Sequence, residues 1–247
     1  MPTGERELMA AALANIFTAA DMPMDDATTK ALSTHWQLLM TANESFNLTA
    51  AKDRADAAER HYLDSLLPLP VFKSLLKEGG SIVDLGAGNG FPGLALALAL
   101  SGTKISLLEA TGKKCAFLED AANALGLSER VQVLNLRAEE AGRAVTLRGS
   151  FRIATARGLA ALNVLLEYAF PLLEVGGFLL AYKGGNYQAE LDEAANALKE
   201  LGGSLEQVFA CDLPICSEKR TLLAIRKNEP TPEKYPRRPG MPTKRPL

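Results

Sequence analysis

The most informative segment of this chain is Val83-Asp84-Leu85-Gly86-Ala87-Gly88-Asn89-Gly90-Phe91-Pro92-Gly93. In it an apolar run ends on the acid Asp84, and alternating glycines lead into an alanine- and leucine-rich segment. This order predicts a strand, a tight turn and the start of a helix, because glycine accepts positive φ and lets a ligand approach the backbone. Pro92 suits the first turn of that helix, where its missing N–H costs nothing. The stretch is therefore typical of a turn that binds a nucleotide-like ligand.

Two acidic residues make this pattern more specific than the glycines alone. Asp84 lies two residues before the first glycine, and Glu109 ends the next apolar run, Lys104 to Leu108. This spacing places Glu109 at the end of the neighbouring parallel strand, where a carboxylate can accept hydrogen bonds from a ribose diol.

The kind of nucleotide follows from position and charge. A dinucleotide fingerprint needs glycine at its first, third and sixth positions, and the sixth here is Phe91. A pyrophosphate also prefers a helix N-terminus without a carboxylate such as Asp84 nearby. S-adenosylmethionine has no phosphate and carries a sulfonium and an ammonium group, so the acid favours it. The turn indicates a methyltransferase, with an NAD or FAD oxidoreductase and a purely structural turn as alternatives.

Length and composition agree with one catalytic domain. The chain has 247 residues, of which 47% are hydrophobic, and this is enough for a full core. Its net charge of -2 argues against a uniformly cationic nucleic-acid binder but leaves room for a local basic face. The three cysteines and two histidines form no metal-ligand pattern, so no metal is expected. No signal segment is evident and the longest apolar run, Leu94 to Leu100, is too short to span a bilayer, so we expect a cytoplasmic protein without membrane contact.

From residue 81 onward, strand and helix patterns alternate, which predicts a parallel sheet with helices on both faces. The predicted strands cover residues 81–85, 104–108, 131–136, 151–155, 204–210 and 219–226, and residues 173–184 are predicted to form a turn and the fifth strand. Predicted helices cover 113–125 and 187–201. They indicate an α/β, Rossmann-like class I S-adenosylmethionine-dependent methyltransferase fold with a seven-stranded, mostly parallel sheet. The predicted division is a helical extension (1–78), the methyltransferase domain (79–227) and a basic Pro-rich tail (228–247).

The helical extension carries two apolar stripes, which we expect in the core. The stripe residues are Leu8, Leu13, Ile16 and Phe17, then Leu32, Trp36, Leu39 and Met40. A later helix carries His61, Asp64 and Ser65. A hydrolase is excluded because neighbours on one helix project side by side, without a relay from base to nucleophile. The three residues form either a partly solvated helix face or a part of the site's mouth.

The end of the fourth predicted strand, at Ala156-Arg157-Gly158-Leu159, is where the target of such enzymes usually lies. The chain has no Asn/Asp-Pro-Pro-aromatic segment for amine methylation, no cysteine there for carbon-5 methylation and no complete lysine-centred tetrad for ribose methylation. Guanine N7 fits what remains, because its lone pair is available at neutral pH without deprotonation.

With these residues assembled, the chain resembles the bacterial small-subunit ribosomal RNA guanine-N7 methyltransferase family, also called glucose-inhibited division protein B. The resemblance rests on Asn47-Leu48-Thr49, His61, Asp64-Ser65-Leu66, the turn from Asp84 to Gly93, Lys113-Lys114, Phe117-Leu118, Arg137, Glu139, Arg157 and Lys183-Gly184. It implies methyl transfer to N7 of one guanine in small-subunit rRNA, near the decoding region. The chain departs from the family at Ala87, where many members have serine or threonine, and at Glu109, which is often aspartate.

The turn chemistry and the resemblance together predict the cofactor contacts. These are Asp84, Gly86, Gly88, Gly90, Phe91, Glu109, Ala110, Ala138, Glu139 and Arg157. No residue is assigned as a catalytic acid or base, because N7 needs none. A small-molecule methyltransferase and a non-catalytic RNA-binding module stay open as alternatives.

The predicted RNA contacts combine the tail with lysines of the domain. Residues 226–247 hold seven basic and two acidic side chains, and their many prolines predict an extended tail. The resemblance reaches Tyr235-Pro236-Arg237-Arg238-Pro239-Gly240, so we expect Arg237 and Arg238 to join Lys113, Lys114 and Lys183 in a basic rim that binds rRNA or a ribosomal particle. A solubilising tail is the alternative, and the protein is expected to act as a monomer.

Overall fold

The computed structural model describes residues 3–44, 49, 51 and 53–247 of the chain, without the side chain of Thr3. The predicted break at Asn43 to Thr49 and the resemblance at Asn47 and Leu48 therefore fall largely outside the described residues.

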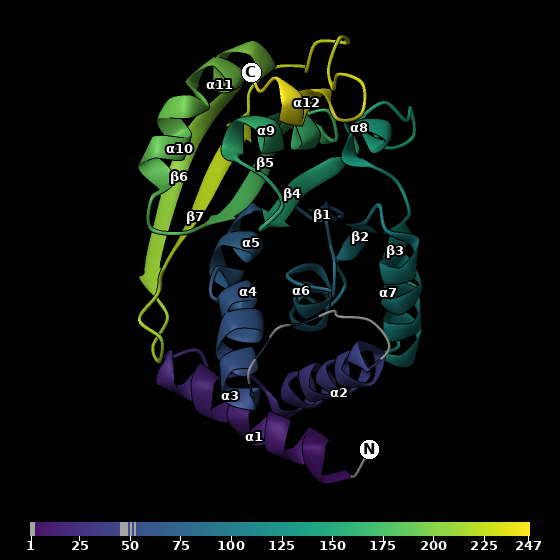
Figure 1. Cartoon of the computed structure of the whole chain (residues 1–247), viewed down its shortest axis with the longest axis vertical. Coiled ribbons are helices and arrows are strands. Elements are labelled where there is room, and N and C mark those ends of the chain that lie inside the picture. Colours follow the sequence, from purple (N-terminus) through teal and green to yellow (C-terminus); the bar gives the residue numbers. More distant parts are fainter. Residues whose placement is uncertain (1–2, 45–48, 50, 52) are drawn as a thin grey trace.

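A single seven-stranded sheet, in the order β3-β2-β1-β4-β5-β7-β6, forms the centre of the described structure (Figure 1). The strands are β1 (Ser81–Leu85), β2 (Lys104–Leu108), β3 (Val131–Leu134), β4 (Phe151–Arg157), β5 (Leu173–Lys183), β6 (Gly203–Asp212) and β7 (Lys219–Lys227). Strands β1 to β5 run parallel, and β7 is antiparallel to both β5 and β6. The predicted seven-stranded, mostly parallel sheet is confirmed.

Helices cover both faces of the sheet (Figure 1). The helical segments before the sheet are α1 (Thr3–Ala19), α2 (Asp26–Asn43), α3 (Arg54–Ala57), the π-helix η1 (Ala58–Leu63), α4 (Asp64–Leu66) and α5 (Leu69–Leu75). The later ones are α6 (Gly93–Ala99), α7 (Gly112–Ala124), α8 (Ala138–Ala141), α9 (Leu162–Ala169), α10 (Tyr187–Glu193), α11 (Ala195–Leu201) and α12 (Met241–Lys244). The single helix predicted over 187–201 is wrong, because Ala194 separates α10 from α11.

Alternation along the strands divides the core between the two faces. In β1, Ile82 packs with the N-terminal helices, α6 and α7, whereas Val83 packs with α9 and α11 on the other face. Since the N-terminal helices and the sheet share one apolar cluster, these helices are continuous with the domain in packing. The three-part division of the chain stays a prediction.

The first apolar stripe is confirmed at Leu13, Ile16 and Phe17 and differs from the predicted one only at its first residue. Leu8 is 54% exposed, so its predicted place in the core is wrong, whereas Met9 is fully buried together with Leu13 and Phe17. The spacing of four residues from Met9 to Leu13 and again to Phe17 keeps these side chains on one helix face, and Leu8 lies outside it. Among the described residues, no helix has the length and apolar character to cross a membrane.

Candidate functional site

Two adjoining cavities lie at the carboxyl ends of the parallel strands, where ligands of open α/β sheets bind. The first cavity has a volume of about 330 Å³ and the second about 630 Å³. Arg157, Gly158 and Leu159, at and after the end of β4, line both. A ligand in one cavity would therefore lie next to a ligand in the other.

The glycine turn forms the end of β1 and the start of α6. Gly86 has φ of 71°, and Gly88 and Gly90 are also positive, as predicted. The backbone N–H of Gly93 donates to Oδ2 of Asp84 at 2.8 Å, and a Cβ added at Gly93 would lie 2.5 Å from that oxygen. The helix begins at Gly93, so Pro92 is its N-cap rather than part of its first turn as the sequence predicted.

Glu109 lies at the end of β2 beside the turn. Its Oε2 accepts from the backbone N–H of Gly88 at 3.0 Å, and its Oε1 accepts from the N–H of Thr111 at 2.8 Å. These bonds hold the carboxylate at the edge of the first cavity, which it lines. This is where the sequence places an acceptor for a ribose diol.

Six of the ten predicted cofactor contacts line the first cavity: Gly86, Glu109, Ala110, Ala138, Glu139 and Arg157. Lys114, predicted as an RNA contact, also lines it. The structure adds Leu136, Arg137, Leu159 and Tyr168, among others. Nothing in the sequence pointed to Tyr168, because it reaches the cavity only through the packing of α9.

The remaining predicted contacts, Asp84, Gly88, Gly90 and Phe91, do not line the first cavity. Phe91 is 4% exposed and stacks on the ring of His61 with 5.0 Å between centroids, while the guanidinium of Arg157 lies 5.5 Å from its centroid. Phe91 thus packs against His61 and Arg157, two side chains that line the second cavity, without lining either cavity itself. Asp84 is fully buried, and its Oδ1 has no hydrogen-bond partner in the described part of the chain.

Asp84 carries an unusual pKa. Burial raises it from 3.8 to about 7, against the lowering effects of the Gly93 N–H and of Arg157. A buried acid with an unpartnered oxygen is suited to a cationic ligand, which would favour the ionised form. The carboxylates of Asp84 and Glu109 therefore fit a sulfonium-bearing, phosphate-free cofactor such as S-adenosylmethionine.

We expect Asp84→Asn to change how stability depends on pH. The folded chain keeps this proton up to pH about 7 and the unfolded carboxyl loses it near 3.8, so the acid destabilises the fold as pH rises through that window. The free energy of unfolding of the variant, relative to wild type, should rise between pH 4 and 7 by at most about 1.4 kcal/mol per pH unit.

Urea unfolding across this pH range measures the effect, with the exposed Asp120→Asn as control. His35 and His61, whose pKa values burial lowers to about 4, titrate in both proteins and cancel in the difference. A difference that is flat in pH would contradict the account of Asp84.

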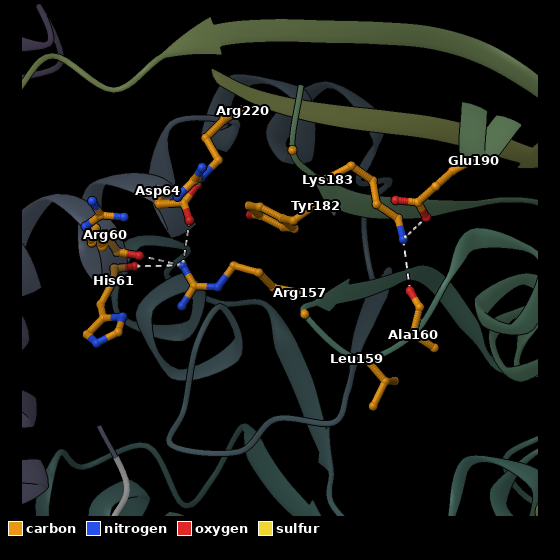
Figure 2. Close-up of a pocket in the computed structure, with 12 residues that line it drawn as sticks. Arg60, His61, Asp64, Arg157, Leu159, Ala160, Tyr182, Lys183, Glu190 and Arg220 are labelled. Atoms are coloured by element: carbon orange, nitrogen blue, oxygen red, sulfur yellow. Dashed lines mark hydrogen bonds and ion pairs between the residues drawn. The ribbon is translucent and has the colours of Figure 1, made fainter. Parts of the chain in front are cut away.

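Asp64 is the centre of a charge network at the second cavity (Figure 2). Its Oδ2 accepts from Nη1 of Arg157 at 3.1 Å, and its Oδ1 accepts from Nε of Arg220 at 3.2 Å. The same Nη1 of Arg157 donates to the carbonyls of Arg60 and His61 at 3.1 and 3.3 Å. This network joins the N-terminal helices to β4 and β7.

The interpretation of His61, Asp64 and Ser65 as a partly solvated helix face holds only for His61, which is half-buried. It is wrong for the other two, since Asp64 is 6% exposed and Ser65 is fully buried. His61 and Asp64 line the second cavity, which is the arrangement expected of the site's mouth.

Two of the predicted RNA contacts are held in ion pairs. Lys183 is 8% exposed in its side chain, and its Nζ donates to Oε2 of Glu190 at 2.6 Å and to the carbonyl of Ala160 at 2.9 Å (Figure 2). Arg237 pairs with Glu167, whose side chain is 1% exposed. Both charges are compensated within the chain, and Lys183 also lines the second cavity, so the RNA contacts of these two residues stay predictions. Lys113 and Arg238 are exposed.

The C-terminal segment, residues 228–247, is not the extended tail that its prolines predicted. Met241–Lys244 forms the short helix α12, and Tyr235 is 4% exposed within the apolar cluster of α9 and α11. The guanidinium of Arg148 donates to the carbonyls of Thr231 and Tyr235 at 3.0 and 2.9 Å, which fixes the start of the segment. Within the described ranges, no three His, Cys, Asp or Glu side chains gather as metal ligands.

The chain is similar to proteins of one family over most of its length. The family model described as rRNA small subunit methyltransferase G matches residues 28–222. A ribosomal RNA small subunit methyltransferase G of Moorella thermoacetica is 44% identical over 211 residues, which cover 85% of this chain and 86% of the relative. The protein of that name from Carboxydothermus hydrogenoformans is 37% identical over 239 residues, covering 97% of this chain and 100% of the relative.

Solved structures share the fold at low identity. An O-methyltransferase from Bacillus cereus in complex with SAH has a TM-score of 0.60 and 17% identity, and the match covers 90% of this chain and 100% of that one. A cofactor-bound protein from MTB has a TM-score of 0.61 and 16% identity, with 87% and 96% covered. These matches confirm the predicted methyltransferase fold, and the sequence matches identify the family: the chain belongs to the ribosomal RNA small subunit methyltransferase G family.

Proposed function

We propose that this chain transfers the methyl group of S-adenosylmethionine to N7 of a guanine in 16S ribosomal RNA. The observation that carries the proposal is the pair of adjoining cavities in a chain of this family. The first has a ribose acceptor, Glu109, at the end of β2, and the second opens at the end of β4 beyond Arg157. A methyl donor in the first cavity and a target base in the second would meet beside Arg157, Gly158 and Leu159.

The first cavity supplies contacts suited to the methyl donor. Glu109 is placed to accept from the ribose, Gly86 lets the ligand approach the turn, and Ala138 and Glu139 form the opposite side. Asp84 is buried below the turn and does not reach the cavity, and a cationic ligand bound there would favour its ionised form. S-adenosylmethionine supplies an activated methyl group on its sulfonium.

The second cavity supplies the place for the base. The ring of Tyr182 lines it, and its Oη donates to the carbonyl of Ser65 at 2.7 Å, which fixes the ring (Figure 2). Because N7 needs no general base, the chain's contribution is orientation, which is worth about 7–11 kcal/mol in well-aligned intramolecular reactions. Arg157 is positioned by three acceptors between the two cavities.

The RNA backbone would contact the exposed cations Lys113 and Arg238, with Lys114 at the edge of the first cavity. We further propose that the chain acts as a monomer, because the described residues of one chain line both cavities without a second copy. Its RNA substrate supports a place in the cytoplasm.

A methylation assay distinguishes the proposed function, methylation of rRNA, from methylation of a small molecule. Purified chain, labelled S-adenosylmethionine and small ribosomal subunits or their RNA should give 7-methylguanosine in 16S rRNA. Calorimetry should give binding of S-adenosylmethionine and none of NADH. Label transfer to small hydroxyl or amine compounds, with no transfer to RNA, would contradict the proposal and support the small-molecule alternative.

Glu109→Ala should weaken S-adenosylmethionine binding by about 1.5–3 kcal/mol, the value of a hydrogen bond to a charged group. Calorimetry measures this, and Glu119→Ala on the exposed face of α7 provides a control with the same change of charge. Equal affinity of the Glu109 variant and wild type would show that Glu109 does not hold the ribose.

A further inference from the structure

The C-terminal segment packs against the wall of the first cavity. Helix α8, which carries Ala138 and Glu139 into that wall, lies next to α12 and α9 (Figure 1). The backbone N–H of Gly240 donates to Oε1 of Glu139 at 2.8 Å, and Glu139 is 4% exposed. A Cβ added at Gly142, just after α8, would lie 2.9 Å from Cγ of Pro236. The segment therefore contacts α8 at the cavity-lining Glu139 and again at Gly142, directly after the helix.

Helix α9 connects the same segment to the cavity a second time. Tyr168 lines the first cavity, and its Oη lies 3.1 Å from Oγ1 of Thr243. The preceding residue, Glu167, points into the segment instead and is almost fully buried. Neighbouring residues of one helix thus join the cavity and the C-terminal segment.

Arg237 is the charged anchor of this arrangement. Its backbone N–H and its Nε donate to Oε1 of Glu167 at 2.7 and 2.9 Å, and its Nη2 donates to Oε2 at 2.5 Å. Removing the guanidinium leaves the buried Glu167 carboxylate without its cation, which is costly. The neighbouring Arg238 is exposed and has no ion pair among the described residues. The two arginines, predicted alike from sequence, therefore lie in different environments.

We propose that Arg237 is a positioning residue for the methyl donor: its pair with Glu167 holds residues 236–243 against α8 and Tyr168, and so fixes the cavity wall formed by Glu139. The proposal rests on the proposed function, since it takes the first cavity to hold S-adenosylmethionine. This role is separate from the RNA contact predicted for Arg237 from sequence, which stays a prediction.

The test compares the two adjacent arginines by calorimetry with S-adenosylmethionine and no RNA. Arg237→Ala should raise the dissociation constant by about tenfold, within the usual range of coupling between sites. Arg237→Lys keeps the charge and should recover part of the affinity, whereas Arg238→Ala should leave it unchanged. Lys234→Ala removes an exposed ion pair of the same segment, with Glu200, and controls for general loosening.

Kinetics separate positioning from a loss of folded protein. Arg237→Ala should raise KM for S-adenosylmethionine with little change of kcat at saturating cofactor, whereas partial unfolding would lower kcat with KM unchanged. Glu167→Gln keeps the shape of the side chain and covers the case in which Arg237→Ala does not fold. Its KM should rise as well.

The outcomes separate this proposal from the proposed function. Wild-type affinity in folded Arg237→Ala and in Glu167→Gln would overturn the positioning role while leaving the methyltransferase intact. An equal loss of affinity in Arg238→Ala would overturn it too, because the effect would not depend on the buried pair. A wild-type chain that binds no S-adenosylmethionine would overturn the proposed function first, and the positioning role with it.

Discussion

Gly86→Val will abolish binding of S-adenosylmethionine while leaving the sheet folded. Gly86 has φ of 71°, which a β-branched residue resists, and a Cβ there would lie 2.7 Å from Cδ1 of Leu159 at the cavity wall. The new side chain would also occupy space that the cofactor needs. We expect a loss of affinity of about 100-fold or more, which corresponds to roughly 2.7 kcal/mol.

Gly126→Val provides the matched control for this variant. Gly126 also has positive φ, of 68°, but an added Cβ meets nothing within 4 Å and the residue does not line the first cavity. It should cost stability from backbone strain without loss of cofactor affinity. Calorimetry measures affinity and circular dichroism the fold; a folded Gly86→Val protein with wild-type affinity would contradict the placement of the cofactor.

Asp64→Ala will both destabilise the chain and reduce methyl transfer. Asp64 is the shared partner of Arg157 and Arg220, and its side chain is 7% exposed. Removing one member of a buried ion pair costs about 3–5 kcal/mol, and the partial exposure of both arginines places the effect near the lower limit. Methyl transfer should fall as well, because Arg157 lines both cavities and loses a partner that orients it.

Urea unfolding gives the change in stability and labelled S-adenosylmethionine gives the rate. Glu5→Ala, which breaks the exposed pair with Arg54, should change neither quantity noticeably. If Asp64→Ala unfolds like wild type, the network carries no part of the stability. If it also methylates like wild type, Arg157 needs no support from Asp64.

The sheet could be predicted from the sequence because its signals are local. The apolar runs that end at Asp84 and Glu109 mark β1 and β2, and the positive φ of Gly86 follows from glycine itself. The ends of elements were less predictable, as at Pro92, where the helix starts one residue later. Local patterns thus predict the presence of an element more reliably than the residue at which it begins.

The charge pairings could not be predicted, because they join residues far apart in the chain. Arg237 pairs with Glu167, which is 70 positions earlier in the chain, and Asp64 pairs with Arg220, which is 156 positions later. A tail rich in arginine and proline has the same composition whether it is solvated or anchored, so composition alone suggested an extended cationic segment. Only the packing of α9 against the segment distinguishes Arg237 from Arg238.

Mass spectrometry of 16S rRNA from cells with and without the chain shows directly whether this chain makes 7-methylguanosine in that RNA. We predict that loss of the chain removes one 7-methylguanosine, that the wild-type chain restores it and that Gly86→Val does not. A 16S rRNA with the same 7-methylguanosine content in the presence and absence of the chain would contradict the claim.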